Sequence, residues 1–236
     1  MSWITNADIW AALITLTALE IVLGIDNIVF ISIITGNLPE YRQAAARRTG
    51  LALAVITRLL LLGAIFLLAR FTAPLFTLFR QPFSLRDLVL IGGGLFLLAK
   101  STIEIHGDIE GVHAAAGNRS PGSFYSVIAQ ILLLDVVFSL DSVITAIGMS
   151  DRYAVMAAAI VIAVGFMLMF AGAVSQFVQR HPTLKMLALA FLVLIGVALL
   201  ADGFGLHIPK GYIYFAMAFS FGVEMLNLQL RKRREA

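Results

Sequence analysis

Seven long apolar stretches constrain the fold of this chain more than any other feature of its sequence. A helix needs about 20 apolar residues to cross the hydrocarbon core of a bilayer. Continuous runs of this kind exclude a transmembrane barrel, which needs alternating strands, and lipid cannot satisfy the edges of an open sheet. The sequence therefore predicts an all-α, polytopic membrane protein with seven transmembrane helices. The predicted spans lie at roughly 10–34, 49–69, 87–105, 124–148, 154–176, 183–202 and 210–228.

The composition excludes the main soluble alternatives. Of the 236 residues, 60% are hydrophobic and 13% are charged. Soluble domains carry about 45–50% apolar and about 25% charged residues. An ordinary soluble enzyme, a disordered chain and a nucleic-acid-binding protein are therefore excluded. The absence of cysteine rules out disulfides and thiolate metal sites, and the N-terminal apolar run lacks a signal-peptide pattern, so we expect a retained helix.

The positive charges predict the orientation. With the N-terminus outside, eleven Lys and Arg residues fall at the cytoplasmic ends of the spans and five at the outer ends. Because cytoplasmic segments are enriched in Lys and Arg, this distribution favours an N-out/C-in orientation. The cytoplasmic set is Arg42, Arg47, Arg48, Lys100, Arg119, Arg180, Lys185, Arg231, Lys232, Arg233 and Arg234, and the outer set is Arg70, Arg80, Arg86, Arg152 and Lys210.

An internal repeat relates the first and fourth spans, which read ALEIVLGIDNIVFI at 18–31 and LLDVVFSLDSVITA at 133–146. A weaker match, LVLIG, occurs at 88–92 and 192–196. A unit of three helices returns in the opposite orientation, which predicts two inverted repeats plus a seventh helix, a common transporter construction. The alignment matches Glu20 with Asp135, Asp26 with Asp141 and Asn27 with Ser142, each pair being 115 residues apart (135 − 20 = 141 − 26 = 115).

The repeat divides the chain into four parts. We expect the first inverted repeat over residues 1–105 and the second over residues 124–207. A cytoplasmic loop over 106–123, rich in Gly, Ser and acidic residues, separates them. The seventh span and a basic cytoplasmic tail follow over residues 208–236.

The four carboxylates of the repeat are the candidate functional groups. At the centre of a helix each Asp costs about 2.5–3.5 kcal/mol, so four bare acids would cost roughly 10 kcal/mol. We expect them to face the bundle interior, where water, protons or a cation compensate their charge. An unwound turn near Gly24 and Ser139 would bring the acids of each span into one cavity. The structural alternative is ion pairing with Arg58 or Lys100, but two cations cannot neutralise four acids.

The available donors indicate a hard divalent cation. Carboxylates, one amide oxygen and one hydroxyl suit Mg²⁺, Ca²⁺ or Mn²⁺, whereas softer metals prefer cysteine. Beyond these donors, Lys100 and Glu104 are expected either to extend to the membrane interface or, through Glu104 and His106, to line an inner vestibule. Glu224 is expected to pair with Arg231 or to join a cytoplasmic exit. The candidate charge partners or path residues are thus Arg58, Lys100, Glu104 and Glu224.

Five segments resemble the TerC family of bacterial membrane proteins. The resemblance covers essentially the whole chain and implies a seven-helix protein of the bacterial inner membrane, in a family grouped with LysE-type exporters. It implies export of a divalent metal, with Mn²⁺ first, and a metal site at Glu20, Asp26, Asn27, Asp135, Asp141 and Ser142. The segments are LEIVLGIDNIVFISI (19–33), ARRTGL (46–51), LFLLAKSTIEIH (95–106), LDVVFSLDSVITAIGM (134–149) and IPKGYIYFAMAFSFGVEMLN (208–227).

We therefore expect a secondary exporter, not an enzyme, that exchanges a metal ion for protons and needs no cofactor. The family name refers to tellurium resistance, but four carboxylates would repel a tellurite oxyanion. Two alternatives stay open. Export of another small solute, such as an amino acid, needs a roomier pocket with a cationic partner, and a non-transporting scaffold or assembly partner would not need Asp26 or Asp141. The expected partners are the lipid bilayer, the metal ion and a coupling proton, with no nucleic acid.

Overall fold

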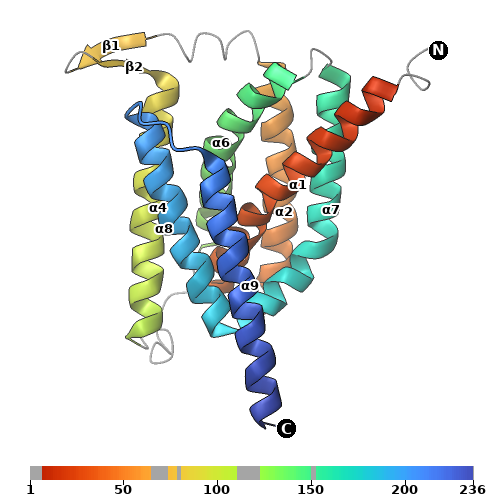
Figure 1. The fold of residues 1–236 in the computed structure, drawn as a ribbon, viewed down its shortest axis with the longest axis vertical. Helices are drawn as coiled ribbons and strands as arrows, with labels where there is room; N and C mark the ends of the chain where they lie inside the picture. The colour runs from red at the N-terminus through yellow and green to blue at the C-terminus, as the bar shows by residue number, and fades with distance from the viewer. Residues whose placement is uncertain (1–6, 65–73, 79–80, 111–122, 150–152, 236) are drawn as a thin grey trace.

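The computed structural model describes residues 7–64, 74–78, 81–110, 123–149 and 153–235. Within these residues, long helices form a bundle and a short antiparallel hairpin lies at one end of it (Figure 1). This is the all-α polytopic fold that the apolar runs predict. The helices are α1 (Ala7–Gly36), α2 (Glu40–Gly63), α4 (Leu85–Ile109), α6 (Phe124–Met149), α7 (Tyr153–Arg180), α8 (Pro182–Gly203) and α9 (Lys210–Glu235), and the hairpin strands are β1 (Pro74–Leu78) and β2 (Gln81–Ser84).

Five of the described helices are long and apolar enough to cross a membrane, namely α1, α4, α7, α8 and the Gly211–Arg231 part of α9. Helix α6 adds an apolar stretch over Phe124–Ser139. Helix α2 covers the predicted span 49–69 only to Gly63, because residues 65–69 lie outside the described part of the chain. Helix α1 begins at the end of the bundle that carries the hairpin, and α9 ends at the opposite end (Figure 1). The number of spans and the N-out/C-in orientation stay predictions.

Some elements differ from the limits that hydropathy predicts. Helix α2 begins at Glu40, nine residues before the apolar run, because Ala, Arg and Gln are strong helix formers (49 − 40 = 9). Helix α4 continues to Ile109, into the segment expected to be a loop. The hairpin lies between the second and third predicted spans, beyond both, and so does not place a sheet edge in lipid.

The helix pairs have a regular pattern. Helix α1 packs along α7, α2 along α6, and α4 along α8. A two-fold operation would exchange α1 with α6, α2 with α7 and α4 with α8. This operation converts the α1–α7 pair into the α2–α6 pair and leaves the α4–α8 pair unchanged. A two-fold relation between the predicted repeats would produce this pairing, although the repeat boundaries themselves stay a prediction.

Helices α4 and α8 cross at two glycines. A Cβ atom built on Gly94 would lie 2.7 Å from the carbonyl oxygen of Gly196, and one built on Gly196 would lie 3.1 Å from the carbonyl oxygen of Gly94. Small residues let membrane helices approach until their backbones touch. The crossing therefore leaves no room for a side chain at either position.

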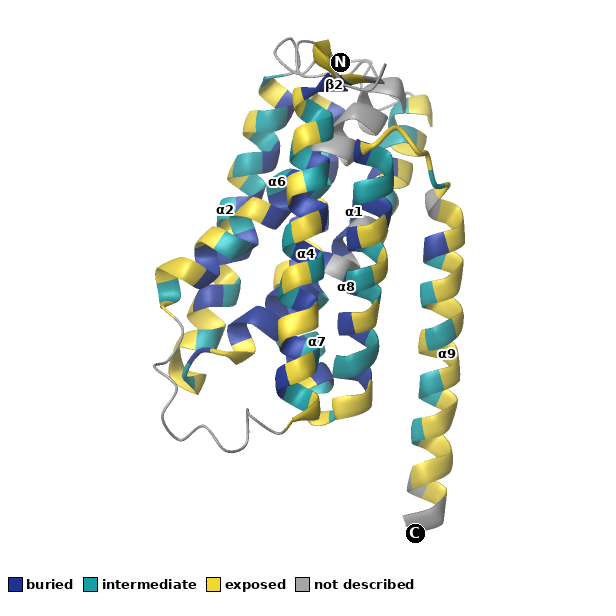
Figure 2. Ribbon diagram, turned by 90° about the vertical axis from the view of Figure 1, so that its left-hand side faces the viewer, coloured by how far each residue is buried: buried dark blue, intermediate teal, exposed yellow. Residues whose placement is uncertain are grey.

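Helix α9 stands apart from the rest of the bundle (Figure 2). It packs mainly on α8, and among its residues with a described exposure only Ile213 is buried. The other helices surround the buried core, so the functional site is sought among them.

Candidate functional site

Arg58 lies between two acids that the sequence repeat pairs with each other. From α2, its Nη1 donates to Oε2 of Glu20 on α1 at 2.5 Å, and its Nε donates to Oδ1 of Asp135 on α6 at 2.9 Å. Glu20 and Arg58 are each 4% exposed and Asp135 is 6% exposed. The structure thus joins the matched acids of the first and fourth predicted spans through one arginine.

The three side chains stabilise one another in a buried setting. A buried charge is costly unless it is paired and hydrogen-bonded, and charge-assisted bonds from a guanidinium to carboxylates are among the strongest. The planar guanidinium presents several donors, so one arginine can reach two acids from different helices. With all three groups ionised, the cluster carries a formal charge of −1, because two carboxylates face one guanidinium.

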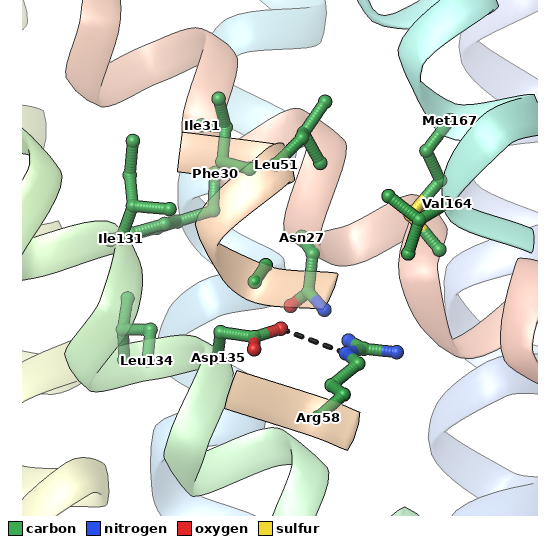
Figure 3. Close-up of a pocket in the computed structure, with 11 residues that line it drawn as sticks. Asn27, Phe30, Ile31, Leu51, Arg58, Ile131, Leu134, Asp135, Val164 and Met167 are labelled. Atoms are coloured by element: carbon green, nitrogen blue, oxygen red, sulfur yellow. Dashed lines mark hydrogen bonds and ion pairs between the residues drawn. The ribbon is translucent and has the colours of Figure 1, made fainter. Parts of the chain in front are cut away.

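A small cavity lies beside this cluster, and its labelled side chains are drawn in Figure 3. Its volume is about 10 Å³, which is about the space of one water-sized sphere. The polar lining consists of Asn27, Arg58 and Asp135, whose polar ends gather in the close-up. The apolar walls are Phe30, Ile31, Leu51, Ala54, Ile131, Leu134, Val164 and Met167. The cavity is therefore small and lined mainly by hydrocarbon, with three polar side chains among its walls.

Two polar atoms at the cavity are not engaged by Arg58. The Nδ2 atom of Asn27 is buried and has no hydrogen-bond partner among the described residues. Asp135 uses Oδ1 for Arg58, which leaves its Oδ2 outside that bond, with the Ser139 hydroxyl as a neighbour of the carboxylate. Since buried polar groups are nearly always paired, the unpaired Nδ2 donor of Asn27 indicates room for a hydrogen-bond acceptor such as a water molecule.

The unwound turn expected near Gly24 and Ser139 is wrong, because α1 and α6 are continuous helices through both residues. Gly24 instead permits close packing, since a Cβ atom there would overlap the end of the Met167 side chain on α7. Gly24 thus allows α1 to pack closely on α7 and does not interrupt the helix.

The chain matches the family described as "Integral membrane protein TerC family" over residues 5–236. It belongs to the TerC family. It is 54% identical to the UPF0053 inner membrane protein YgdQ of Escherichia coli over 98% of each chain. It is 53% identical to a UPF0053 protein of Haemophilus influenzae, again over 98% of each. The match to the UPF0053 inner membrane protein YoaE of E. coli, at 48% identity, covers 99% of this chain and 45% of that relative. No solved structure matches the chain.

The TerC assignment, together with the membrane-length helices, makes this chain a multi-pass inner membrane protein. The Arg58 cluster and its cavity thus lie inside the helix bundle of a membrane protein. This is the setting in which ionisable side chains most often mark a transport path.

Three of the six predicted metal-site residues of the TerC chain lie outside the described side chains, namely Asp26, Asp141 and Ser142. Of the other three, the structure brings Asn27 and Asp135 to one cavity and joins Glu20 to Asp135 through Arg58. Among the described side chains, no group of three acids or histidines is close enough to hold a metal ion. The complete six-residue site stays a prediction.

A second polar cluster in this TerC protein surrounds Glu104. Lys100 donates to Oε1 of Glu104 at 2.6 Å, and Nδ2 of Asn37 donates to the same oxygen at 2.9 Å. Glu104 is only 4% exposed, so the expectation that it extends to the interface is wrong. His106 pairs with Glu110 at 3.2 Å, and a vestibule at Glu104 and His106 stays a prediction. Sequence reasoning missed Asn37, which lies in the short α1–α2 connection.

Glu224 of the TerC chain lies on the outward α9. It accepts a hydrogen bond from Nδ2 of Asn227 at 3.3 Å. With Arg231 and with Thr183 at the start of α8, both residues line a groove between the two helices. Glu224 and the Arg58 cluster thus line separate cavities.

Proposed function

We propose that this TerC protein exports a divalent metal cation, with Mn²⁺ as the expected cargo, from the cytoplasm across the inner membrane. The observation that carries the proposal is that Arg58 joins Glu20 and Asp135 in the buried interior of the bundle. The sequence repeat predicts that these two acids are equivalent. A cavity large enough for one water-sized ligand lies beside them. Inverted-repeat transporters bind their cargo where the halves meet. A cation is the cargo that two buried carboxylates favour.

The size of the cavity favours an ion over an organic solute. A volume of about 10 Å³ has no room for an amino acid. The carboxylate of an amino acid would also need a cationic partner, and Arg58 already holds two acids of the protein. A scaffold gains little from a buried ionic cluster, because well-packed apolar residues are often equally stabilising.

The ligand set of the proposal combines Glu20, Asn27 and Asp135 with the predicted donors Asp26, Asp141 and Ser142. These are hard oxygen donors, which suit Mn²⁺. Four carboxylates carry more negative charge than one divalent ion and Arg58 can compensate. Protons would neutralise the remainder, and exchange of metal for protons follows as the proposed coupling.

The test is the manganese content of cells that lack the protein, carrying an empty vector, the wild type, Asp26→Asn or Asp141→Asn. We expect the wild type to lower cellular manganese and both variants to resemble the empty vector. The exposed Glu40→Gln is a matched control that should resemble the wild type. Equal manganese with the wild type and the empty vector would reject the proposal.

Coupling is tested separately with a protonophore in the same cells. Proton exchange predicts that export stops when the proton gradient collapses. Export that continues unchanged would reject proton coupling but not the proposed metal site.

A further inference from the structure

We propose that Arg58 is an internal counter-ion of Glu20 and Asp135 and competes with the exported cation for these two acids. The inference rests on the proposed function and adds to it a residue that sets how tightly the cargo is held. Arg58 acts on the cargo through the two acids that it contacts.

The guanidinium and the cavity share one carboxylate. Arg58 engages Asp135 through Oδ1, while Asp135 also lines the cavity with its second oxygen outside that bond. Asn27 lines the same cavity, and the end of its amide without a partner among the described residues is the Nδ2 donor, so its Oδ1 acceptor is the atom that would ligate a cation. A cation held by Asp135 and Asn27 would therefore share Asp135 with the guanidinium.

Two cations on one carboxylate repel each other, and the repulsion is strong where hydrocarbon walls exclude water. An arginine cannot relieve it by losing its proton, because its side chain stays charged in proteins. The metal must therefore displace Arg58 from at least one acid or bind more weakly in its presence. Either outcome is competition.

Arg58 also links the two predicted halves. It spans from Glu20 on α1 to Asp135 on α6, so it neutralises part of the charge of both halves and ties them together. It thereby supplies one positive charge that a proton would otherwise have to supply. If Arg58 is removed, protons should replace it on the two acids.

The experiment measures Mn²⁺ binding to the purified full chain in lipid nanodiscs, for the wild type, Arg58→Gln, Arg58→Lys and Arg47→Gln. Arg58→Gln should bind Mn²⁺ at least about tenfold more tightly than the wild type at neutral pH, within the usual range of coupling between sites. Arg47 lies on the same helix outside the cluster, so its variant should match the wild type.

Each result bears on the inference in a defined way. If the wild type binds Mn²⁺ and Arg58→Gln binds it equally or more weakly, Arg58 is a structural or ligand-supporting residue and the inference is overturned, while the proposed function stands. If neither protein binds Mn²⁺, the proposed function fails and the inference fails with it. If Arg58→Gln does not fold, Arg58→Lys carries the test. Lys cannot hold both acids with a planar fork, so tighter binding than the wild type supports competition, and equal or weaker binding overturns it.

Discussion

At the residue scale, Glu20 and Asp135 can be buried because one guanidinium reaches both carboxylates. Arg58 compensates the charge of both acids, whereas each acid pairs with Arg58 alone in this cluster, so the three positions are not equivalent. If one acid is lost, Arg58 still forms an ion pair with the other acid. Loss of the arginine leaves two buried carboxylates that face each other without a cation.

This inequality predicts the order of stabilities. Asp135→Asn should lower the free energy of unfolding by about 1.5–3 kcal/mol, the value of a hydrogen bond to a charged group. Arg58→Met should lower it more, by about 3–5 kcal/mol, as when a buried ion pair is broken. Thermal unfolding in detergent gives the comparison. Added Mn²⁺ should restore part of the loss in Arg58→Met if the cation takes the place of the arginine, and a more stable Arg58→Met than Asp135→Asn would contradict this account.

The acids and Arg58 could be singled out from the sequence, because ionisable residues within apolar spans are rare and the repeat aligns them. The contacts among these residues could not be predicted from the sequence. Hydropathy places Arg58 within its span but does not say which neighbouring helix faces it, and the bridge depends on the packing of α2 against α6. The partnership of Asn37 with Glu104 was hidden for the same reason, since it joins residues 67 positions apart.

At the element scale, the crossing of α4 and α8 shows how little space separates two membrane helices. The sequence marked the region through the repeated LVLIG, whose second copy ends at Gly196. The contact partner, however, is Gly94, two residues beyond the first copy, while Gly92 has no atom within 4 Å of an added Cβ. A run of three glycines thus contains one that faces the crossing and one that faces open space.

Substitutions at Gly94 and Gly92 distinguish the glycine at the crossing from the glycine that faces open space. Gly94→Ala should destabilise the protein by about 1–3 kcal/mol, because the new methyl group meets the backbone of Gly196, which cannot rotate away. Gly92→Ala should be neutral or slightly stabilising, because alanine is the better helix former and the space is open. Melting temperatures of the purified variants decide the matter, and equal effects at both positions would refute the crossing.

The limits of the elements show where hydropathy loses information. Apolar runs predicted helices where the structure has them, but polar helix formers extend α2 at its start. Helix α4 continues beyond its apolar run, where Lys185 reaches Asp108 at 2.7 Å. The hairpin of β1 and β2 lies in a segment too short for a span and was not predicted. Helix continuity and side-chain pairing, rather than apolarity, set these boundaries.

At the scale of the whole molecule, the first described helix begins at one end of the bundle and the last described helix ends at the other (Figure 1). An odd number of crossings has this consequence, and the basic residues Arg231 and Arg233 then favour the cytoplasm for the end of α9. Helices α1 and α2 of the first predicted half pack against α7 and α6 of the second, so the two halves are in contact along two helix pairs.

The orientation can be tested in the natural chain because it contains no cysteine. A single cysteine introduced as Ser2→Cys should react with a membrane-impermeant maleimide in intact cells. One introduced as Arg233→Cys should react only after the cells are opened. The reverse pattern would place the N-terminus in the cytoplasm and reject the N-out/C-in prediction.

The small cavity has a consequence for selectivity. With about 10 Å³ beside Arg58, the cation of the proposed function would not fit with its coordinated water and would have to be dehydrated first. Mg²⁺ gives up its water reluctantly and usually keeps several molecules when it binds to proteins. Such a space therefore penalises the most abundant competing divalent ion before any donor distinguishes it. In this protein, discrimination would begin with the removal of the hydration shell rather than with the choice of ligand.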